Sequence, residues 1–264
     1  MDVLTPRTLE EALALKAEHP EARFIQGGTD VMVELNFAHS RPPAIVNLAE
    51  LAELRGWSED GDALRLGSAL TYTEAMASPL AGRLPALAEA SRTVGSPQIR
   101  NRGTLGGNLG TGSPAGDALP PLLVERAEVE LRSVRGMRTL PLDAFLLGVK
   151  RTALEPDELI TSVRLTPSGA AQTFMKVGPR NAMVIAVCSL AVVVDSGAAE
   201  VRAAFGSAAV TATLVAVPLA DAASLPDRIA DAASPIDDVR GSARYRRHAL
   251  RVLASRALER CLRS

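Results

Sequence analysis

The sequence of 264 residues has only two cysteines, and this scarcity argues against a metal centre held by the chain alone. Cys188 and Cys261 lie far apart, and neither belongs to a CxxC pair or has a neighbouring histidine. A zinc ion or an iron–sulfur cluster needs several such ligands close together. We therefore predict no metal on this chain, so that any cluster must belong to a partner. Cys188 is assigned no chemistry, because its apolar neighbours would not stabilise a thiolate.

Long apolar runs and an excess of one charge are also absent. No run approaches the roughly 20 apolar residues that cross a bilayer. The formal net charge of −1 gives no general attraction to nucleic acid or anionic lipid. The acidic start, Met1-Asp2, lacks the basic and apolar regions of a secretory signal. The sequence thus predicts a cytoplasmic protein with neither a membrane span nor a nucleic-acid partner.

Patterns of catalytic side chains are missing as well. The three histidines, His19, His39 and His248, have no spacing typical of a catalytic triad or a metal ligand set. No other residue is placed by the sequence as a nucleophile or a general base. We therefore predict no catalytic residue. Only two tyrosines occur, Tyr72 and Tyr245, and neither is assigned to stack on a ligand ring.

Glycine, by contrast, is concentrated in one segment. Six of the twenty glycines lie between Gly103 and Gly116. Such a segment can expose its backbone N–H groups and point several of them at one anion. A Gly-x-Gly-x-x-Ala pattern begins at Gly110, but Pro114 interrupts it and no strand precedes it, so it is not the dinucleotide fingerprint. The segment also lacks the lysine of a P-loop, which leaves a different phosphate site or a long surface loop.

A shorter glycine turn favours the phosphate interpretation. Arg23-Phe24-Ile25-Gln26 is typical of a buried strand that Gly27-Gly28 ends, and Thr29 is predicted to cap the helix that follows. Two such turns suit a ligand with two phosphates. Asp30 and Asp117 lie beside the turns, where a carboxylate could accept from a ligand's hydroxyls or simply cap a helix.

Two further polar residues have alternative interpretations. Asn108 is predicted either to occupy a left-handed turn or to donate from its amide to a phosphate or a ring carbonyl. Lys176 lies in a strand candidate, where general expectation favours an exposed lysine.

Mixed helices and strands are predicted for the first part of the chain. Thr8-Leu9-Glu10-Glu11 has the form of a capping box, and apolar residues then recur at helical spacing until Pro20. A second capping box, Thr71-Tyr72-Thr73-Glu74, precedes another helix. Further strands are expected at residues 44–48, 63–70, 129–131 and 159–165, and a helix at about 84–93. This unit is predicted to end near Pro167.

An antiparallel meander with a terminal helix is predicted for the remainder. Its strands are expected at residues 172–177, 184–195 and 200–205, separated by glycine turns. Residues 245–262 place leucine, alanine and cysteine on one helical face, which predicts a helix packed on the sheet. The alanine-rich span 208–238 is not assigned.

These motifs together resemble a known family. Gln26-Gly27-Gly28-Thr29-Asp30 and Thr104-Leu105-Gly106-Gly107-Asn108 are similar to the two flavin-phosphate loops of the FAD-binding (medium) subunits of molybdenum hydroxylases, and Ser113-Pro114-x-x-Asp117 follows at the family's spacing. That family includes xanthine dehydrogenase and aerobic carbon monoxide dehydrogenase. The resemblance extends through Phe174-x-Lys176 to Asp238-x-Arg240-x-Ser242 and covers nearly the whole chain.

The resemblance implies a fold and a set of cofactor-binding residues. The fold would be α+β, with a two-part FAD-binding domain of the PCMH type over residues 1–168. A smaller C-terminal domain of the carbon monoxide dehydrogenase flavoprotein type, with an antiparallel sheet and packed helices, would cover residues 169–264. The implied FAD-binding residues are Ile25, Gln26, Gly27, Gly28, Thr29, Asp30, Val94, Gly95, Thr104, Leu105, Gly106, Gly107, Asn108, Asp117, Ile160 and Lys176.

Within this set the resemblance implies different roles. The two glycine loops would hold the pyrophosphate, and Asp117 a hydroxyl of the sugar or ribityl part. Val94, Gly95, Ile160 and Lys176 would lie nearer the flavin rings.

The function that the resemblance implies is electron transfer. A partner large subunit would carry the molybdenum cofactor, a partner small subunit would carry [2Fe-2S] clusters, and FAD on this chain would pass electrons to an acceptor such as NAD or a quinone. Two alternatives remain open at this point: a stand-alone FAD-dependent reductase or oxidase of the same fold, and a flavin-free binding scaffold.

Overall fold

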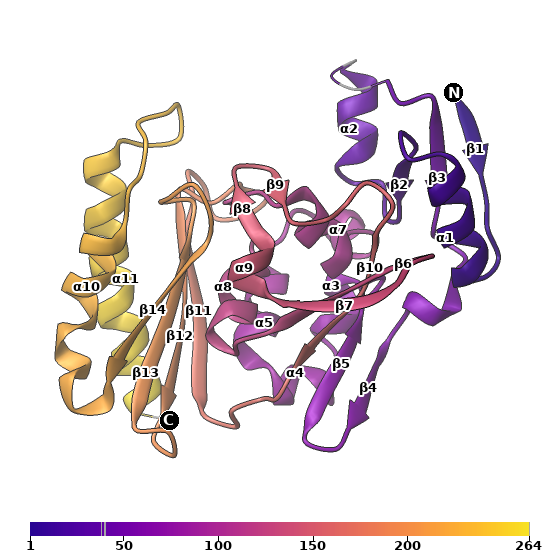
Figure 1. The fold of residues 1–264 in the computed structure, drawn as a ribbon. Coiled ribbons are helices and arrows are strands. Elements are labelled where there is room, and N and C mark those ends of the chain that lie inside the picture. The colour runs from indigo at the N-terminus through magenta and orange to yellow at the C-terminus, as the bar shows by residue number, and fades with distance from the viewer. Residues whose placement is uncertain (38, 40, 264) are drawn as a thin grey trace.

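A small parallel sheet and two helices form the N-terminal part of the chain in the computed structural model, which describes residues 1–37, 39 and 41–263 (Figure 1). The sheet has the order β1 (Asp2–Leu4), β3 (Ala44–Asn47), β2 (Arg23–Ile25). Helix α1 (Leu9–Glu18) begins at Thr8, whose side chain accepts from the N–H of Glu11, so the predicted helix is confirmed. Its apolar face packs with β3 in a separate small core.

A second, antiparallel sheet lies at the centre of the molecule. Its order is β4 (Trp57–Asp60), β5 (Ala63–Gly67), β10 (Leu159–Leu165), β6 (Glu128–Ser133), β7 (Gly136–Pro141). Strand β10 comes late in the sequence but pairs between β5 and β6, with a bulge between Ile160 and Ser162. The strands predicted from apolar runs in this part are therefore confirmed, and β10 brings its residues beside elements that precede it by about 100 positions.

Short helices connect and cover these sheets. In chain order they are α2 (Val31–Asn36), the 3-10 helix η1 (Ala52–Leu54), α3 (Tyr72–Ala75), α4 (Leu80–Arg83), α5 (Pro85–Arg92), α6 (Pro97–Arg100), α7 (Leu105–Thr111), α8 (Leu119–Val124) and α9 (Leu142–Phe145), followed by the hairpin β8 (Leu146–Gly148) and β9 (Arg151–Thr152). The capping box at Thr71 is confirmed, because the Thr71 side chain accepts from the N–H of Glu74 and the Glu74 side chain accepts from the N–H of Thr71. The main apolar core joins these helices to the central sheet.

The C-terminal part is an antiparallel meander with helices on both faces. Strands β11 (Ala171–Val177), β12 (Cys188–Asp195), β13 (Glu200–Gly206) and β14 (Thr213–Pro218) follow one another in the sheet, as predicted for the first three. Helices α10 (Leu225–Ala232) and α11 (Ala243–Leu262) cover its outer face after the 3-10 helix η2 (Leu219–Ser224), and α5 and α8 pack on the inner face. Strand β12 begins at Cys188 rather than at Val184 as predicted, because residues 184–187 belong to a loop.

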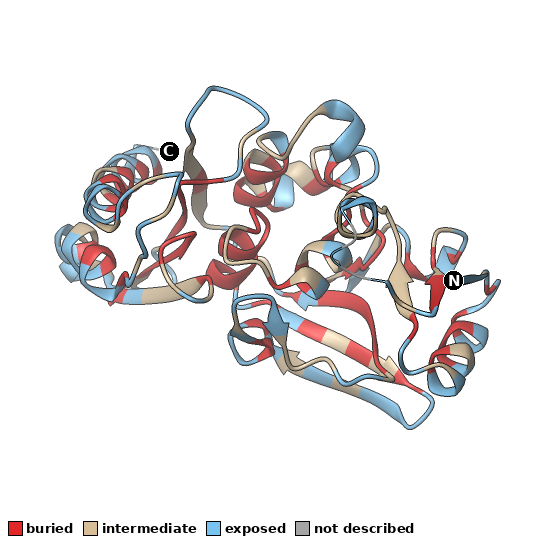
Figure 2. Ribbon diagram, turned by 90° about the horizontal axis from the view of Figure 1, so that it is seen from above, coloured by how far each residue is buried: buried red, intermediate tan, exposed pale blue. Residues whose placement is uncertain are grey.

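The strands of this sheet could be predicted because the sheet is buried. Both of its faces are covered, so β12 is a nearly continuous apolar run. In Figure 2, buried residues follow the sheets and the helix sides that face them, while the outer sides of α10 and α11 are exposed. Polar contacts also connect the sheet to its neighbours: the carboxylate of Glu89 on α5 accepts from the backbone N–H of Phe174 at 2.7 Å. Among the described residues, no helix is both long and apolar enough to cross a membrane.

Candidate functional site

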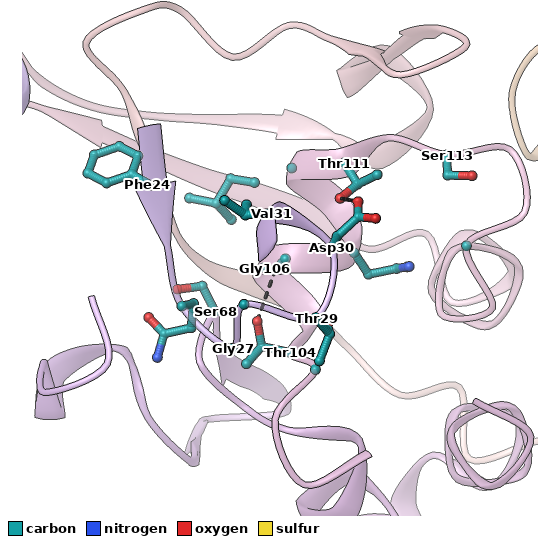
Figure 3. Close-up of a pocket in the computed structure, with 18 of the residues that line it drawn as sticks. Phe24, Gly27, Thr29, Asp30, Val31, Ser68, Thr104, Gly106, Thr111 and Ser113 are labelled. Atoms are coloured by element: carbon teal, nitrogen blue, oxygen red, sulfur yellow. Dashed lines mark hydrogen bonds between the residues drawn. The ribbon is translucent and has the colours of Figure 1, made fainter. Parts of the chain in front are cut away.

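A cavity of about 840 Å³ lies where β2, α7, β10 and the loop before β12 meet (Figure 3). This volume is within the range of small-molecule and cofactor sites. The cavity wall contains residues from the two glycine segments that the sequence singled out, although about 75 positions separate them. Its shape therefore depends on how closely these segments approach one another.

The first glycine turn makes that approach possible. A Cβ at Gly27 would lie 1.7 Å from the carbonyl oxygen of Arg102, so only glycine lets the turn pack on the backbone that leads into α7. Gly28 adopts a φ of +76°, which side chains rarely tolerate. Among the described residues, the N–H groups of Gly28, Thr29 and Asp30 have no hydrogen-bond acceptor. These donors are free for an anion.

The second glycine segment differs from the prediction of a bare N–H cradle, because Leu105–Thr111 forms a helix. The N–H of Gly106 donates to the carbonyl of Ser68 at 2.8 Å, and that of Gly107 to the hydroxyl oxygen of Thr104 at 3.0 Å. The Thr104 hydroxyl keeps its own hydrogen for a further acceptor. Glycine at position 106 allows α7 to pack closely on Ser68, because an added Cβ would lie 2.6 Å from the Cβ of Ser68.

One hydrogen bond joins the two segments directly. Asp30, rather than the predicted Thr29, is the N-cap residue of α2, but its side chain does not cap the helix. Instead its Oδ2 accepts from the hydroxyl of Thr111, at the end of α7, at 2.7 Å (Figure 3). This bond connects the end of α7 to the first glycine turn and so helps to set the distance between the two glycine segments. A diphosphate that contacts both segments would need a particular distance between them.

A testable consequence concerns Thr111. Replacing it with valine keeps the shape but removes the hydrogen bond to Asp30, at a cost to folding of about 1 kcal/mol. We expect affinity for FAD, which would contact both turns, to fall about fivefold, while affinity for FMN, with one phosphate, changes less than about twofold. Fluorescence titration with both flavins checks this. Equal losses for the two ligands would contradict a role in spacing the turns.

A buried ion pair closes the cavity on the side of β11. Lys176 Nζ lies 2.5 Å from Asp117 Oδ2, and the side chains are only 5% and 9% exposed. The prediction of an exposed strand lysine is therefore wrong, because β11 runs past α5 and buries this side chain between sheet and helix. Burial raises the pKa of the Asp117 carboxyl, and Lys176 opposes that rise.

Several buried polar atoms of the cavity wall have no partner among the described residues. They are Gln26 Oε1, Asn108 Oδ1 and Asp117 Oδ1. Buried acceptors are normally satisfied, so three of them on residues that line one cavity indicate a ligand that carries hydroxyl or N–H donors. Asn108 lies inside α7, so its alternative as a left-handed turn residue is wrong.

Tyr72 also lines the cavity and was not predicted there. It is 5% exposed, and its burial together with the carboxylates of Asp117 and Asp30 raises the pKa of its hydroxyl. The phenol therefore stays neutral and can donate a hydrogen bond. Its place follows from the capping box at Thr71, which starts α3 at Tyr72.

Most of the predicted binding residues line this one cavity. They are Gln26, Gly27, Gly28, Thr29, Asp30, Val94, Gly95, Thr104, Gly106, Gly107, Asn108, Asp117 and Ile160. Ile25 and Leu105 are not part of the lining, and Leu105 is fully buried in the core. Lys176 lines a neighbouring cavity and reaches the site through Asp117.

Sequence reasoning missed other lining residues. They include Phe24, Ser68, Thr111, Ser113 and residues 183–185. Phe24 could have been found, because side chains two positions apart share a face of a strand and Gln26 was already assigned. Ser68 and residues 183–185 carry no such signal.

Metal and thiol chemistry have no support in the described part of the chain. No group of three or more histidine, cysteine or acidic side chains there could hold a metal ion. Burial raises the pKa of Cys188 to about 12 and that of Cys261 to about 11. Both thiols therefore stay protonated.

Comparison with known proteins gives consistent matches. Residues 1–167 match the family model described as the FAD binding domain in molybdopterin dehydrogenase. The chain is 38% identical over 213 residues to the xanthine dehydrogenase FAD-binding subunit of Escherichia coli O157:H7, covering 77% of this chain and 73% of the relative. It is 32% identical to the nicotine 6-hydroxylase medium subunit of Paenarthrobacter nicotinovorans, covering 96% and 94%.

Solved structures agree with the sequence matches. A chain of carbon monoxide dehydrogenase from Hydrogenophaga pseudoflava superimposes with a TM-score of 0.92 at 28% identity, covering 99% of this chain and 97% of the other. The predicted resemblance and the predicted α+β fold with a C-terminal sheet and helices are thereby confirmed.

Proposed function

Because the chain belongs to the family of FAD-binding domains of molybdopterin dehydrogenases, we propose that it passes electrons between iron–sulfur clusters on a partner subunit and a small acceptor such as NAD or a quinone. Membership confirms the predicted FAD cofactor and the class of flavoprotein oxidoreductase subunit. Flavin suits the proposed task, since it exchanges electrons singly with clusters and in pairs with an acceptor.

One observation carries the assignment of the site. The free N–H donors of the Gly28 turn and the hydroxyl of Thr104 lie on one cavity with three unpartnered buried acceptors. A ligand that matches both sets needs anionic oxygens and also hydroxyl or N–H donors. FAD has a diphosphate, a ribityl chain, a ribose and an adenine amine, so it meets both requirements.

We assign roles to the chain's own residues on this basis. The turn Gly27–Asp30 and Thr104 hold the diphosphate, and Gly106 and Gly107 let the backbone approach it closely. The free Oδ1 of Asp117 accepts from a ligand hydroxyl, and Lys176 favours the ionised form of that carboxylate and holds it in place. Val94, Gly95 and Ile160 contact the rings. Leu105 and Ile25 act through their backbone and through packing.

The proposed partners are those that the family resemblance implies. This chain would assemble with an iron–sulfur small subunit and a molybdenum-cofactor large subunit in the cytoplasm. We also propose that the cofactor domain ends at residue 168 and that residues 169–264, which supply Lys176, form the second domain.

The first experiment is purification of the full chain, followed by an absorbance spectrum and acid release of the chromophore. We expect FAD at about one per chain, and reconstitution by added FAD if the chain is isolated without it. Release of FMN would contradict the diphosphate site. No flavin binding after FAD addition would overturn the proposed function.

A further inference from the structure

One motif of the sequence, Asp238-x-Arg240-x-Ser242, has no role in the proposed function. In the structure it forms a turn and the start of α11. The Asp238 carboxylate accepts from the backbone N–H of Arg240 at 2.8 Å, which closes the turn. The Ser242 side chain accepts from the N–H of Tyr245 and caps the helix. The turn and the cap together place Arg246 in the first part of α11, where only 2% of its surface is exposed.

The guanidinium group of Arg246 connects two segments. It donates to the Asp238 carboxylate at 2.5 Å, and it also donates to the backbone carbonyl of Ser207, which directly follows β13. A buried charge is costly unless it is paired and hydrogen-bonded, and Asp238 provides the pairing. Bonds from a charged donor are stronger than bonds between neutral groups. Arg246 therefore holds the carbonyl of Ser207 in a defined position.

Ser207 has a backbone conformation that needs such support. Its φ is +61°, which is uncommon for a residue with a side chain. Its own hydroxyl gives no support, because Oγ is buried without a hydrogen-bond partner in the described part of the chain. Conformations of this kind persist where the surroundings hold them. The bond from Arg246 thus stabilises a residue whose N–H donates to the carbonyl of Pro114 at 2.7 Å.

Pro114 belongs to the loop between α7 and α8, which forms part of the wall of the 840 Å³ cavity. Apart from the ion pair of Asp117, the bond from Ser207 is the only hydrogen bond between residues 113–117 and a distant segment among the residues described. The end of β13 also packs on the loop, since an added Cβ at Gly206 would lie 3.0 Å from the carbonyl oxygen of Pro114. The position of the loop therefore depends on Ser207.

The loop in turn positions two of the unpartnered acceptors of the cavity. Asp117 lies at its end, and Gly116 packs on Asn108, because an added Cβ at Gly116 would lie 2.8 Å from Asn108 Nδ2. A shift of the loop would move the free Oδ1 atoms of both acceptors. Hydrogen bonds weaken steeply when their distance and angle depart from the optimum. A small shift would therefore weaken the contacts with a ligand.

We propose that Arg246 is a positioning residue for the cofactor. Through Ser207 and Pro114 it holds the loop between α7 and α8 where Asn108 and Asp117 meet the ligand. Arg246 does not belong to the wall of the cavity, so it acts on the cofactor only through this loop. The inference rests on the proposed function and extends it, because it gives the C-terminal part of the chain a role in binding FAD.

The test compares Arg246→Met with the loss of another buried arginine in the same part of the chain. Arg202 is 5% exposed, pairs with Glu200, and donates to the carbonyl of Val124 at the far end of α8. Arg202→Met is therefore the matched control for a broken buried ion pair. Asp238→Asn is the second variant, which removes the charge beside Arg246 but keeps an oxygen acceptor. It replaces Arg246→Met in every comparison if that variant does not fold.

Fluorescence titration of the full chain measures the FAD dissociation constant, at a temperature where circular dichroism shows each variant to be folded. We expect Arg246→Met to bind FAD about tenfold more weakly than the parent, Asp238→Asn about threefold more weakly, and Arg202→Met within about twofold of the parent. An affinity of Arg246→Met equal to that of the parent overturns the inference. Failure of the parent to bind FAD overturns the proposed function instead.

A double-mutant cycle with Asn108→Ala separates positioning from general stabilisation. Asn108→Ala alone should weaken FAD binding about tenfold, because it removes the free amide oxygen. In the Arg246→Met background it should cost less than about threefold, since the contact is already impaired, whereas in the Arg202→Met background it should still cost about tenfold. A merely structural arginine would leave the effect of Asn108→Ala unchanged. Additive effects of Arg246→Met and Asn108→Ala therefore also overturn the inference.

Discussion

Replacing Gly107 with valine is expected to abolish FAD retention and to leave the fold intact. Gly107 lies in α7 and lines the cavity, and apart from its chain neighbours and the backbone of its own helix, the only described atom within 4 Å of an added Cβ is the hydroxyl oxygen of Thr104, at 3.1 Å. The new side chain would therefore fill the space in which the diphosphate is proposed to lie and would crowd the Thr104 hydroxyl. Valine is also a better helix former than glycine, so α7 should not be weakened.

The measurement is the flavin-to-protein ratio after gel filtration, together with the FAD dissociation constant. We expect that constant to rise at least about a hundredfold, which corresponds to about 2.7 kcal/mol of binding free energy. Gly82→Val is the matched control, because Gly82 lies in α4 and, apart from its chain neighbours and its own helix backbone, no described atom lies within 4 Å of an added Cβ. Unfolding temperatures of the flavin-free proteins should agree for the parent and Gly107→Val. Normal flavin content in Gly107→Val would show that α7 does not contribute to flavin binding.

The sequence predicted those parts of the fold whose cause is local. The helix after Thr8 and the helix after Thr71 were found because a capping side chain and an apolar period occur within a few residues. Strands β10, β11 and β13 were found because buried strands are apolar and β-branched. Strand β14 was missed, because its alanine-rich surroundings resemble helix as much as strand.

The parts of the site that could not be predicted depend on contacts between distant segments. Gly106 and Gly107 line the cavity, but their N–H groups donate to Ser68 and Thr104, and only the assembled fold shows this. Lys176 has the neighbours of an exposed strand residue, and its burial results from α5 packing across β11. Local composition carries no information about either contact.

Lys176→Met is expected to be the most destabilising single change at the site. It leaves the Asp117 carboxylate buried without its cation, and breaking a buried pair in this way typically costs about 3–5 kcal/mol. Lys150→Met is the matched control, because Lys150 pairs with Glu34 at the surface with its side chain 55% exposed, and such pairs contribute about 0–1 kcal/mol. Urea unfolding of the flavin-free proteins measures both changes without involving the cofactor.

The pH dependence distinguishes loss of the charge pair from loss of packing. Burial already raises the pKa of Asp117 above 3.8, and removal of Lys176 raises it further. A carboxyl whose pKa is raised on folding favours the folded state when it is protonated, and its contribution is lost as pH rises from the unfolded pKa through the folded pKa. Lys176→Met should therefore lose more stability at pH 8 than at pH 5. A cost independent of pH would mean that Lys176 acts by packing alone.

A double variant, Lys176→Met with Asp117→Asn, removes both charges of the ion pair and tests the role of Asp117. With no charge left at either position, the double variant should recover most of the stability lost by Lys176→Met at pH 8, and its dependence on pH should disappear over this range. Its flavin affinity should nevertheless stay below that of the parent, because an uncharged amide oxygen accepts from a ligand hydroxyl more weakly than the carboxylate oxygen, Oδ1, that is proposed to do so. Recovery of stability without recovery of flavin binding separates the structural role of the pair from the binding role of Asp117.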